Sequence, residues 1–451
     1  MKCHAQILGR SILSSTPISQ PCFSPPSVRL PRCPQKTHSG LFARLSSTKP
    51  QARVEYNWIR GVETLEEYQP GGYNPVMIGD VLHSRYRIVD KLGHGGYSTV
   101  WLARDTTVKR YVALKVNTAD AHPREATVLR TLPKPPSSSP AHRRCLIPVV
   151  FDEFDVQGPN GTYACYITAP AHCNLREISS SRLFPLEVAR ALRYGLTQAV
   201  AYTHSHGYLH GDIHLNNIMI KLPSNFDNLS IIELYERCGE PETVPITRCD
   251  GRPLPPNIPA QAVNFLFLGK YAETMTLADV RPLLSDFGEA FAPASEVRLG
   301  QDCHTPPAFR SPEARFEPQK PLAYVIGMEA LFSIEMVPND EIVAQHIDVL
   351  GPMPREWWLH WEGRGKFFTE DGHPKDAYVE NKWPPLEESF DIDIQKWRRK
   401  WRGVVEEERT AFLDLIRRML LFQPEARHVL QSEWMVKWAL PDFERNPNIS
   451  G

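Results

Sequence analysis

Short apolar runs and one alternating segment predict a group of β-strands between residues 86 and 168. Residues 86–89 and 100–103 are apolar runs on either side of a glycine-rich turn, which is the pattern of a tight hairpin. Residues 112–115 follow at the distance of a third strand, and residues 162–168 alternate in polarity as a further strand would. The first part of the chain is therefore expected to form a small, mostly antiparallel sheet.

Apolar positions at helical spacing predict helices in the second half. Residues 184–206 carry apolar side chains at three- and four-residue intervals, and this predicted helix runs directly into a polar loop at residues 210–217. Further helices are expected over residues 339–350, 412–421 and 433–438. The second half is thus expected to be mainly helical.

The composition is that of an ordinary globular protein. The 451 residues suffice for two lobes or domains, 42% of them are hydrophobic, and the formal net charge is -1. This balance does not favour a direct nucleic-acid partner, which would need a basic surface. Nine cysteines include no Cys-x-x-Cys pair, which argues against a zinc site or a disulfide framework. No apolar run reaches the roughly 20 residues of a membrane span, so no membrane association is expected.

Residues 1–54 form a basic leader that differs from the rest of the chain. They contain no Asp or Glu, yet they carry many Ser, Pro, Lys and Arg residues. This composition is typical of a mitochondrial transit peptide. A disordered basic tail, or an upstream start codon that extends the true protein, fits it equally well.

The polar loop at residues 210–217 carries the first candidate chemistry. Asp212 and Asn217 lie five positions apart, a spacing that suits phosphoryl transfer. The carboxylate can accept a proton from, or orient, an attacking hydroxyl, and the amide oxygen can ligate a magnesium ion. A simple polar turn between helix and strand is the alternative interpretation.

Further short motifs stand in the order of the protein-kinase signature. Val112-Ala113-Leu114-Lys115 precedes the polar loop, and Asp286-Phe287-Gly288 follows it. A glycine-rich stretch that begins at Leu92 comes earlier still, where backbone amides could approach phosphates. Each motif is weak alone, but together and in this order they strongly indicate phosphoryl transfer from a nucleotide.

Two further stretches indicate which group of kinases the chain resembles. Residues 72–76 (Gly-Tyr-Asn-Pro-Val) and 78–80 (Ile-Gly-Asp) precede the first strand, and residues 97–102 (Tyr-Ser-Thr-Val-Trp-Leu) follow the glycines. With these stretches, the chain resembles eukaryotic protein kinases, and most closely SR-protein kinases of a divergent, fungal type. The likeness extends from about Tyr68 to Leu440. It implies an α+β, two-lobed protein-kinase fold, in which a small antiparallel β lobe with one helix accompanies a larger, mainly helical lobe.

This resemblance implies a function and a domain organisation. The expected activity is transfer of the γ-phosphate of ATP, with Mg2+, to Ser or Thr hydroxyls of a protein substrate; the resemblance implies a substrate rich in Arg and Ser. A monomer in the cytoplasm and nucleus is expected, or a mitochondrial protein if the leader directs import. The expected limits are a lead-in at 55–85, a small lobe at 86–171, a large lobe at 172–440 and a tail at 441–451.

The resemblance also assigns roles to individual residues. The nucleotide-binding residues would be Leu92, Gly93, Gly95, Gly96, Ser98, Val100, Ala113 and Lys115. Lys115 would pair with Glu125 of the next helix, although the interval between them is shorter than is usual in kinases. Asp212 would be the catalytic base, and Asn217 and Asp286 would hold magnesium.

Other residues would have structural or docking roles by the same resemblance. His210 would stack under Phe287, which Gly288 follows. Glu313 would form a buried pair with Arg427, a pairing that small-molecule kinases lack. Glu341 and Asp348 lie seven residues apart on one predicted helix face and match acidic positions that dock arginine-rich substrates; an ordinary exposed helix face is the alternative.

The loop departs from the kinase pattern at two positions. Gly211 replaces an arginine that holds a phosphorylated activation loop in many kinases, so regulation of that kind is not expected. His214 replaces a lysine that steadies the transferred phosphate; a neutral imidazole can still donate a hydrogen bond. Aminoglycoside and choline kinases also have the sequence Gly-Asp-x-His in this loop, so a small-molecule phosphotransferase is an alternative.

Two segments depart from the kinase pattern in length. An insert of about residues 222–283 separates Asn217 from Asp286; in SR-protein kinases such an insert is a spacer that affects localisation, and a loop without a role is the alternative. After Ala323, the chain lacks the start of the long buried helix that supports the large lobe of kinases. This truncated central helix suggests a splice or gene-model variant, and it keeps a pseudokinase scaffold with impaired catalysis open as an alternative.

Overall fold

The computed structural model describes residues 54–121, 124–132, 146–179, 183–303, 305, 310, 312–320, 338–398, 403–419 and 429–447. All of them belong to one compact unit, Arg53–Gly451. The basic leader, and the segment 321–337 where the sequence predicts a truncated helix, lie outside the described residues.

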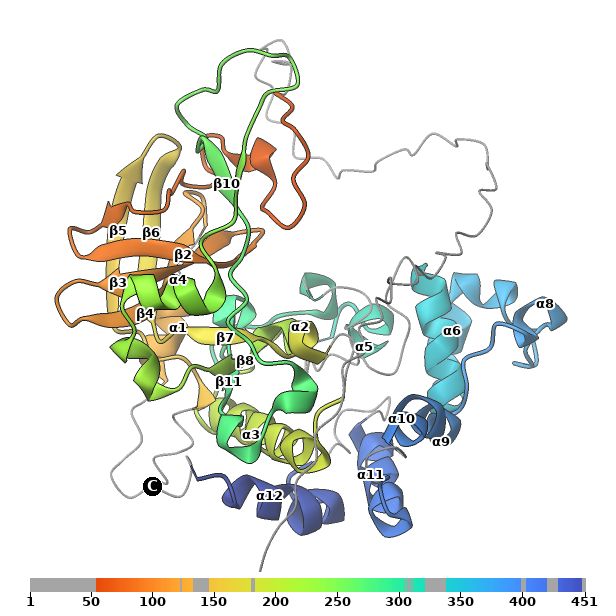
Figure 1. Cartoon of the computed structure of the whole chain (residues 1–451). Helices are drawn as coiled ribbons and strands as arrows, with labels where there is room; N and C mark the ends of the chain where they lie inside the picture. The colour runs from red at the N-terminus through yellow and green to blue at the C-terminus, as the bar shows by residue number, and fades with distance from the viewer. Residues whose placement is uncertain are drawn as a thin grey trace, which may run out of the picture. The chain divides into compact units, whose positions relative to one another are not determined.

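A six-stranded antiparallel sheet forms the small lobe (Figure 1). Its strands are β1 (Val81–Leu82), β2 (Tyr86–Gly95), β3 (Ser98–Asp105), β4 (Arg110–Asn117), β5 (Asp152–Gly158) and β6 (Gly161–Thr168), in the order β1-β2-β3-β4-β6-β5. The predicted strands are confirmed, but β2 is longer than predicted. It continues through Gly93 and Gly95, and only Gly96 and Tyr97 make the turn into β3. A core that includes Trp101, Leu114 and Ile167, each at most 1% exposed, covers one face of the sheet.

A single helix, α1 (Arg124–Thr131), connects this sheet to the segment that follows the large-lobe strand β11 (Pro282–Leu284). Val128 and Leu129 of α1 are buried in the same cluster as Leu284 and Phe287. Movement of α1 would therefore disturb the Asp286-Phe287-Gly288 motif directly.

The long helix α3 (Leu186–Ser205) and a three-stranded sheet hold the polar loop at both of its ends. The sheet consists of β7 (Ala171–Asn174), β8 (Ile218–Lys221) and β11, in the order β11-β8-β7. Val188 and Leu192 of α3 are buried with Ile218 and Ile220 of β8. Because the polar loop runs from the end of α3 to the start of β8, one hydrophobic core positions both of its ends.

The insert between Asn217 and Asp286 is folded. It contains α4 (Ile231–Cys238) and a two-stranded sheet of β9 (Thr243–Pro245) and β10 (Gln261–Val263). Ser230 and Glu233 form a capping box that begins α4, which satisfies two backbone N–H groups that the helix itself cannot.

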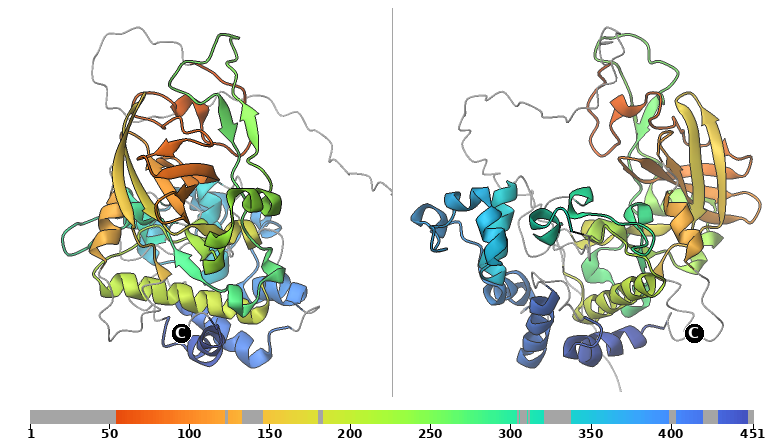
Figure 2. Two further views of the ribbon diagram at one scale, coloured as in Figure 1. Left: turned by 60° about the vertical axis from the view of Figure 1, so that its left-hand side comes forward. Right: turned by 180° about the vertical axis from the view of Figure 1, so that it is seen from behind.

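The insert packs on the small lobe, as the views in Figures 1 and 2 show for α4. Leu234 of α4 is fully buried in one cluster with Val89 and Leu102 of the sheet. Tyr235 Oη donates a hydrogen bond to the Val89 carbonyl at 2.8 Å. Since the insert leaves the large lobe after β8 and returns to it at β11, it spans both lobes and is not a detached loop.

The remaining described helices belong to the large lobe. They are α2 (Leu175–Ser179), α5 (Pro312–Phe316), α6 (Asn339–Leu350), α7 (Arg355–His360), α8 (Asp376–Val379), α9 (Leu386–Ser389), α10 (Lys396–Arg398), α11 (Glu406–Met419) and α12 (Leu440–Glu444), with π-helical turns at Phe390–Gln395 and Met435–Ala439. The helix predicted over 339–350 is confirmed. Phe443 of α12 is 2% exposed and packs on α3, so ordered structure extends past residue 440 into the expected tail. In the part of the chain that the structure describes, no helix combines the length and apolar content of a membrane span.

One buried carboxylate makes the stability of the small lobe dependent on pH. Asp90 on β2 is 1% exposed; its Oδ1 accepts the Lys91 N–H, but its Oδ2 has no hydrogen-bond partner among the described residues. Burial raises the pKa of Asp90 to about 6. An acid whose pKa is raised by folding stabilises the folded state below its unfolded pKa and loses that contribution as the pH rises through the folded pKa.

Replacing Asp90 with Asn should therefore stabilise the protein at pH 7.5, by about 1–3 kcal/mol, because the buried charge is removed. At pH 4.5, where Asp90 is already mostly protonated in the folded state, the gain should be much smaller. Urea unfolding of the wild type and Asp90→Asn at both pH values measures this difference. An equal change in the free energy of unfolding at the two values would show that Asp90 does not titrate as described.

Candidate active site

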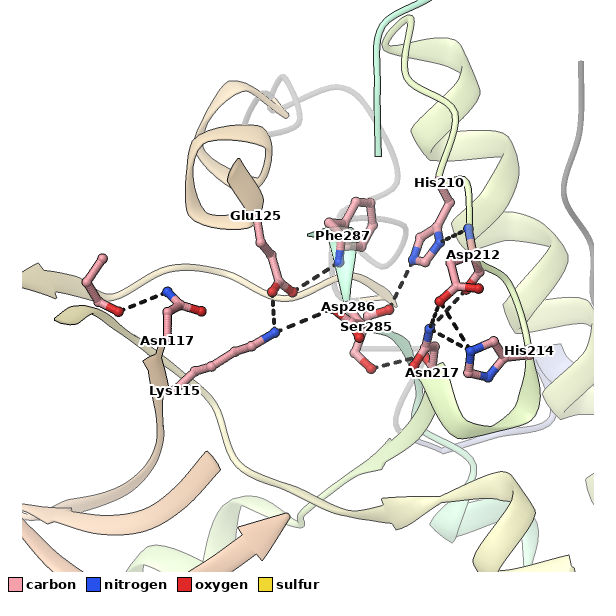
Figure 3. A network of polar contacts seen from close by, with 11 residues as sticks. Lys115, Asn117, Glu125, His210, Asp212, His214, Asn217, Ser285, Asp286 and Phe287 are labelled. Atoms are coloured by element: carbon pink, nitrogen blue, oxygen red, sulfur yellow. Dashed lines mark hydrogen bonds and ion pairs between the residues drawn. The ribbon is translucent and has the colours of Figure 1, made fainter. Parts of the chain in front are cut away.

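The polar loop after α3 brings Asp212, His214 and Asn217 together, as Figure 3 shows. Asn217 Nδ2 donates to the Asp212 carbonyl at 3.0 Å and lies 3.2 Å from Asp212 Oδ2. His214 Nε2 lies 3.3 Å from the same carboxylate oxygen. Asp212 Oδ1 is buried and has no hydrogen-bond partner among the described residues. The Asp212 side chain as a whole is 18% exposed, so its carboxylate has both access to a ligand and unused capacity to accept a hydrogen bond or a proton.

A second group of charges links the small-lobe sheet to the large lobe (Figure 3). Lys115 Nζ on β4 lies 2.5 Å from Glu125 Oε2 on α1 and 3.4 Å from Asp286 Oδ1. The other carboxylate oxygen of Glu125 accepts the Phe287 N–H at 3.0 Å. The structure thus brings Lys115 and Glu125 into contact despite the short interval of ten residues between them.

The electrostatics of this group favour charged side chains. Burial lowers the pKa of Lys115, but the charges of Asp286 and Glu125 outweigh burial and raise that pKa well above its ordinary value. The positive charge of Lys115 holds the pKa of Asp286 below its ordinary value, against the effect of burial. The Asp286 side chain is 50% exposed, so it remains accessible to a ligand.

Asp286 also has an unusual backbone. Its φ of 62° and ψ of 69° are left-handed, a conformation that few residues other than glycine adopt. Such strain persists only where the surrounding structure enforces it, and it is common at functional sites.

His210 and Phe287 connect the polar loop to the Asp-Phe-Gly motif. Their rings meet edge to face with centroids 4.6 Å apart, and Phe287 is fully buried at the start of the short 3-10 helix Phe287–Glu289, which includes Gly288. His210 Nε2 lies 3.0 Å from the Ser285 carbonyl, and the Asp212 N–H donates to His210 Nδ1 at 3.3 Å. This pattern assigns the proton to Nε2. Burial lowers the pKa of His210, so the ring is neutral.

The glycine-rich hairpin lies beside Lys115 in the small-lobe sheet. Val100 pairs with both Gly93 and Lys115 across the sheet, and Ala113 pairs with the neighbouring Leu102. Leu92 is partly buried against the cluster that the insert shares with the sheet, and Ser98 is 7% exposed. The predicted nucleotide-binding residues therefore lie on adjacent strands of a single hairpin and its neighbour.

The three glycines of this hairpin are explained by ligand binding and not by the folded chain alone. Gly93, Gly95 and Gly96 do not adopt the left-handed φ that requires glycine. A Cβ atom added at any of the three would also meet no other atom within 4 Å. Neither backbone conformation nor packing explains three glycines here, whereas the close approach of phosphate groups to backbone amides does.

The donor set suits magnesium that is bound together with a nucleotide. Asn217 and Asp286 offer amide and carboxylate oxygens, the ligand types that Mg2+ prefers. In the part of the chain that the structure describes, no group of three or more His, Cys, Asp or Glu side chains could hold a metal alone. A magnesium ion at this place would therefore need phosphate oxygens and water to complete its six ligands.

The structure gives a physical reason for the departure at Gly211. Its φ is +83°, and a Cβ atom there would lie 2.5 Å from the Glu289 carbonyl oxygen. The arginine that many kinases have at this position would therefore clash with the segment after the Asp-Phe-Gly motif.

Sequence reasoning missed an ion network in this region. Arg124 on α1 donates to the Ala290 carbonyl at 2.9 Å and pairs with Glu296, whose second oxygen accepts from Arg298 at 2.9 Å. Arg298 also pairs with Glu289 at 2.7 Å. No short motif contains these residues, although Arg124 directly precedes Glu125 and Glu289 directly follows Gly288, both predicted site residues.

The predicted structural pair and the predicted docking residues lie outside this group of side chains, and one of them lies outside the described residues. Glu313 is buried on α5, but Arg427 lies outside the described residues, so the predicted pair remains a prediction. Glu341 and Asp348 both lie on α6. Asp348 Oδ2 accepts hydrogen bonds from the Tyr378 hydroxyl at 2.6 Å and the Trp383 N–H at 3.0 Å, so this carboxylate supports the neighbouring segment.

Comparisons with known proteins agree with this geometry. A solved kinase domain covers 80% of the chain and 98% of its own length, with a TM-score of 0.50 at 17% identity. The chain has the protein-kinase fold. The two-lobed α+β fold expected from the sequence is thereby confirmed.

Several curated proteins that resemble this chain in sequence are named as protein kinases. One from Caenorhabditis elegans is 36% identical over 167 residues, which is 36% of this chain and 17% of that protein. SRSF protein kinase 3 of Homo sapiens is 34% identical over 165 residues, or 35% of this chain and 29% of that protein. A serine/threonine protein kinase of Aspergillus fumigatus is 24% identical over 439 residues, or 88% of this chain and 97% of that protein. The chain is thus homologous to protein kinases of the SR-protein type, although it spans less than a third of the first two relatives.

No protein-family model matches the chain.

Replacing Lys115 with Met should weaken ATP binding by at least tenfold and lower turnover, because the cation that faces the phosphates is lost. Isothermal titration with ATP and steady-state kinetics measure both effects, and a melting curve measures the effect of leaving Glu125 unpaired. Lys382→Met, which changes an exposed lysine, is the matched control. Unaltered ATP affinity in Lys115→Met would remove Lys115 from the nucleotide site.

Proposed function

We propose that the chain is an ATP-dependent serine/threonine protein kinase. The observation that supports this most strongly is the convergence of two groups of residues from different parts of the sequence. Lys115, Glu125 and Asp286 form one connected group, and Asp212, His214 and Asn217 form the other. A cation, two candidate magnesium ligands and an unpaired carboxylate oxygen are the parts that phosphoryl transfer requires.

Each residue has a distinct task in this proposal. ATP would lie against the glycine-rich hairpin, with Lys115 paired to its phosphates and magnesium between those phosphates, Asn217 and Asp286; the metal would neutralise negative charge on the phosphates. The Asp212 carboxylate would orient the substrate hydroxyl and accept its proton. Glu125 would hold Lys115 in place, and Asn217 would fix the Asp212 side chain through the 3.2 Å contact.

The substrate class is part of the proposal. The curated relatives carry names of serine/threonine and SRSF protein kinases, which favours a protein hydroxyl over a small molecule. His214 favours the second candidate, a small-molecule phosphotransferase, because it touches both Asp212 and Asn217 where protein kinases use lysine. An imidazole can donate a hydrogen bond to the transferred group without a fixed charge.

In the decisive experiment, the purified protein is incubated with labelled ATP and one of four candidate acceptors: Arg-Ser peptides, neutral Ser peptides, choline or an aminoglycoside. We expect label in peptides. Label only in choline or the aminoglycoside would support the second candidate, and label in none of them, with no ATP binding, would leave a scaffold without activity.

Replacing Asp212 with Asn should lower kcat about 100- to 10,000-fold, because the proton acceptor is lost, and should change ATP affinity little. Single-turnover rates and an ATP-binding titration separate the two effects. Asp371→Asn, at an exposed position, is the matched control and should retain full activity. Unchanged turnover in Asp212→Asn would contradict the proposed base.

Glu341 should favour basic substrates, so Glu341→Lys should raise the KM for an Arg-rich peptide about 3- to 10-fold more than for a neutral peptide. The difference should shrink at 0.5 M salt, since Glu341 is only half-buried and salt screens its attraction to a basic peptide. Asp348 is left unchanged because reversing its charge would disrupt its contacts with Tyr378 and Trp383. Glu356→Lys on the neighbouring helix α7 is the matched control, and equal effects on both peptides would exclude a docking role for Glu341.

A further inference from the structure

The lead-in that precedes the sheet reaches the glycine-rich hairpin through one side chain. Tyr73 is 4% exposed, and its ring packs against Tyr68 with centroids 5.5 Å apart. The Tyr73 hydroxyl donates a hydrogen bond to the Gly95 carbonyl at 2.7 Å. Burial, reinforced by the nearby Glu63 and Glu67, raises the pKa of Tyr73 to about 12, so the hydroxyl remains a donor at neutral pH.

The same lead-in also contacts the strand that follows the hairpin. The Ala119 N–H donates to the Gly72 carbonyl at 3.1 Å, and the Asp120 N–H donates to the Gly71 carbonyl at 2.9 Å. One residue earlier, the Thr118 N–H donates to the carbonyl of Tyr97 in the hairpin turn at 2.9 Å. The turn is thus held from the lead-in and from the end of β4.

The base of the hairpin is held by the lead-in as well. Lys91 on β2 pairs with Glu63, and the two side chains are only 1% and 3% exposed. The Lys91 carbonyl accepts the Leu266 N–H of the insert at 2.7 Å. Because moving the lead-in would leave one of these buried charges without its partner, which is strongly unfavourable, the ion pair holds the lead-in in one position.

We infer that Tyr73 is a positioning residue for the nucleotide site, acting through the Gly95 carbonyl. The inference deepens the proposed kinase function and rests on it. A peptide group is planar, so a hydrogen bond that fixes the Gly95 carbonyl also fixes the direction of the Gly96 N–H. That amide belongs to the stretch where glycines leave open space for phosphates. Holding it in one direction before ATP arrives reduces the ordering cost of binding.

The test replaces Tyr73 with Phe, which keeps the buried ring and removes only the hydroxyl. Tyr163→Phe is the matched control, because Tyr163 is also buried near the lead-in. Its hydroxyl accepts the Asn160 N–H at 3.0 Å and donates to the Tyr73 carbonyl at 3.5 Å, and among the described residues it makes no hydrogen bond to residues 93–98. Hydrogen exchange of the amides of residues 93–98, the KM for ATP and kcat are measured for the wild type and both variants. Melting curves establish that all three are folded.

In Tyr73→Phe we expect faster amide exchange at residues 93–98 and a KM for ATP raised about 3- to 10-fold, with kcat within about twofold. A purely structural role would lower the melting temperature in both variants without this split between KM and kcat. Exchange or KM that changes no more than in Tyr163→Phe would overturn the inference. A wild-type protein that neither binds ATP nor phosphorylates any peptide would instead overturn the proposed kinase function, which is a separate outcome.

Discussion

The ion pair between Lys115 and Glu125 is the contact on which the candidate site depends. It joins the small-lobe sheet to α1, and the second oxygen of Glu125 holds the Phe287 N–H. Phe287 is fully buried against His210, whose Nε2 bonds the Ser285 carbonyl. The position of one carboxylate on α1 is therefore transmitted to the loop that carries Asp212. Because both charges are largely removed from water, losing either partner would leave the other without compensation.

The small lobe has more external support than its six strands alone would have. The lead-in packs Tyr68 and Tyr73 against Ile246 and Ile258 of the insert, so two segments that are distant in sequence form one layer beside the hairpin. The insert adds α4 on the other face, next to Val89. An isolated glycine-rich hairpin is flexible, and these contacts give it a defined position before any ligand binds.

The segment after the Asp-Phe-Gly motif is held by fixed charges. Arg124 of α1 pairs with Glu296 of this segment, and Glu296 also pairs with Arg298. Gly211 leaves no room for the arginine that would respond to phosphorylation. The absence of regulation by phosphorylation of this segment remains a prediction from the sequence.

The sequence by itself indicated strands β2, β3, β4 and β6 of the small lobe, the helix α3, the order of the motifs and most of the residues that gather at the site, but not strands β1 and β5. These features follow from local periodicity and from short motifs whose residues lie close together in the chain. Tertiary structure brings Glu125 to Lys115, a pairing that the sequence indicated only by resemblance, because α1 packs on Leu284 and Phe287. It likewise decided that the insert covers the sheet, that Asp348 bonds Tyr378, and that Tyr73 reaches Gly95. Each of these contacts joins residues separated by 10 to 146 positions, and such distances are set by packing of the whole chain rather than by any local pattern.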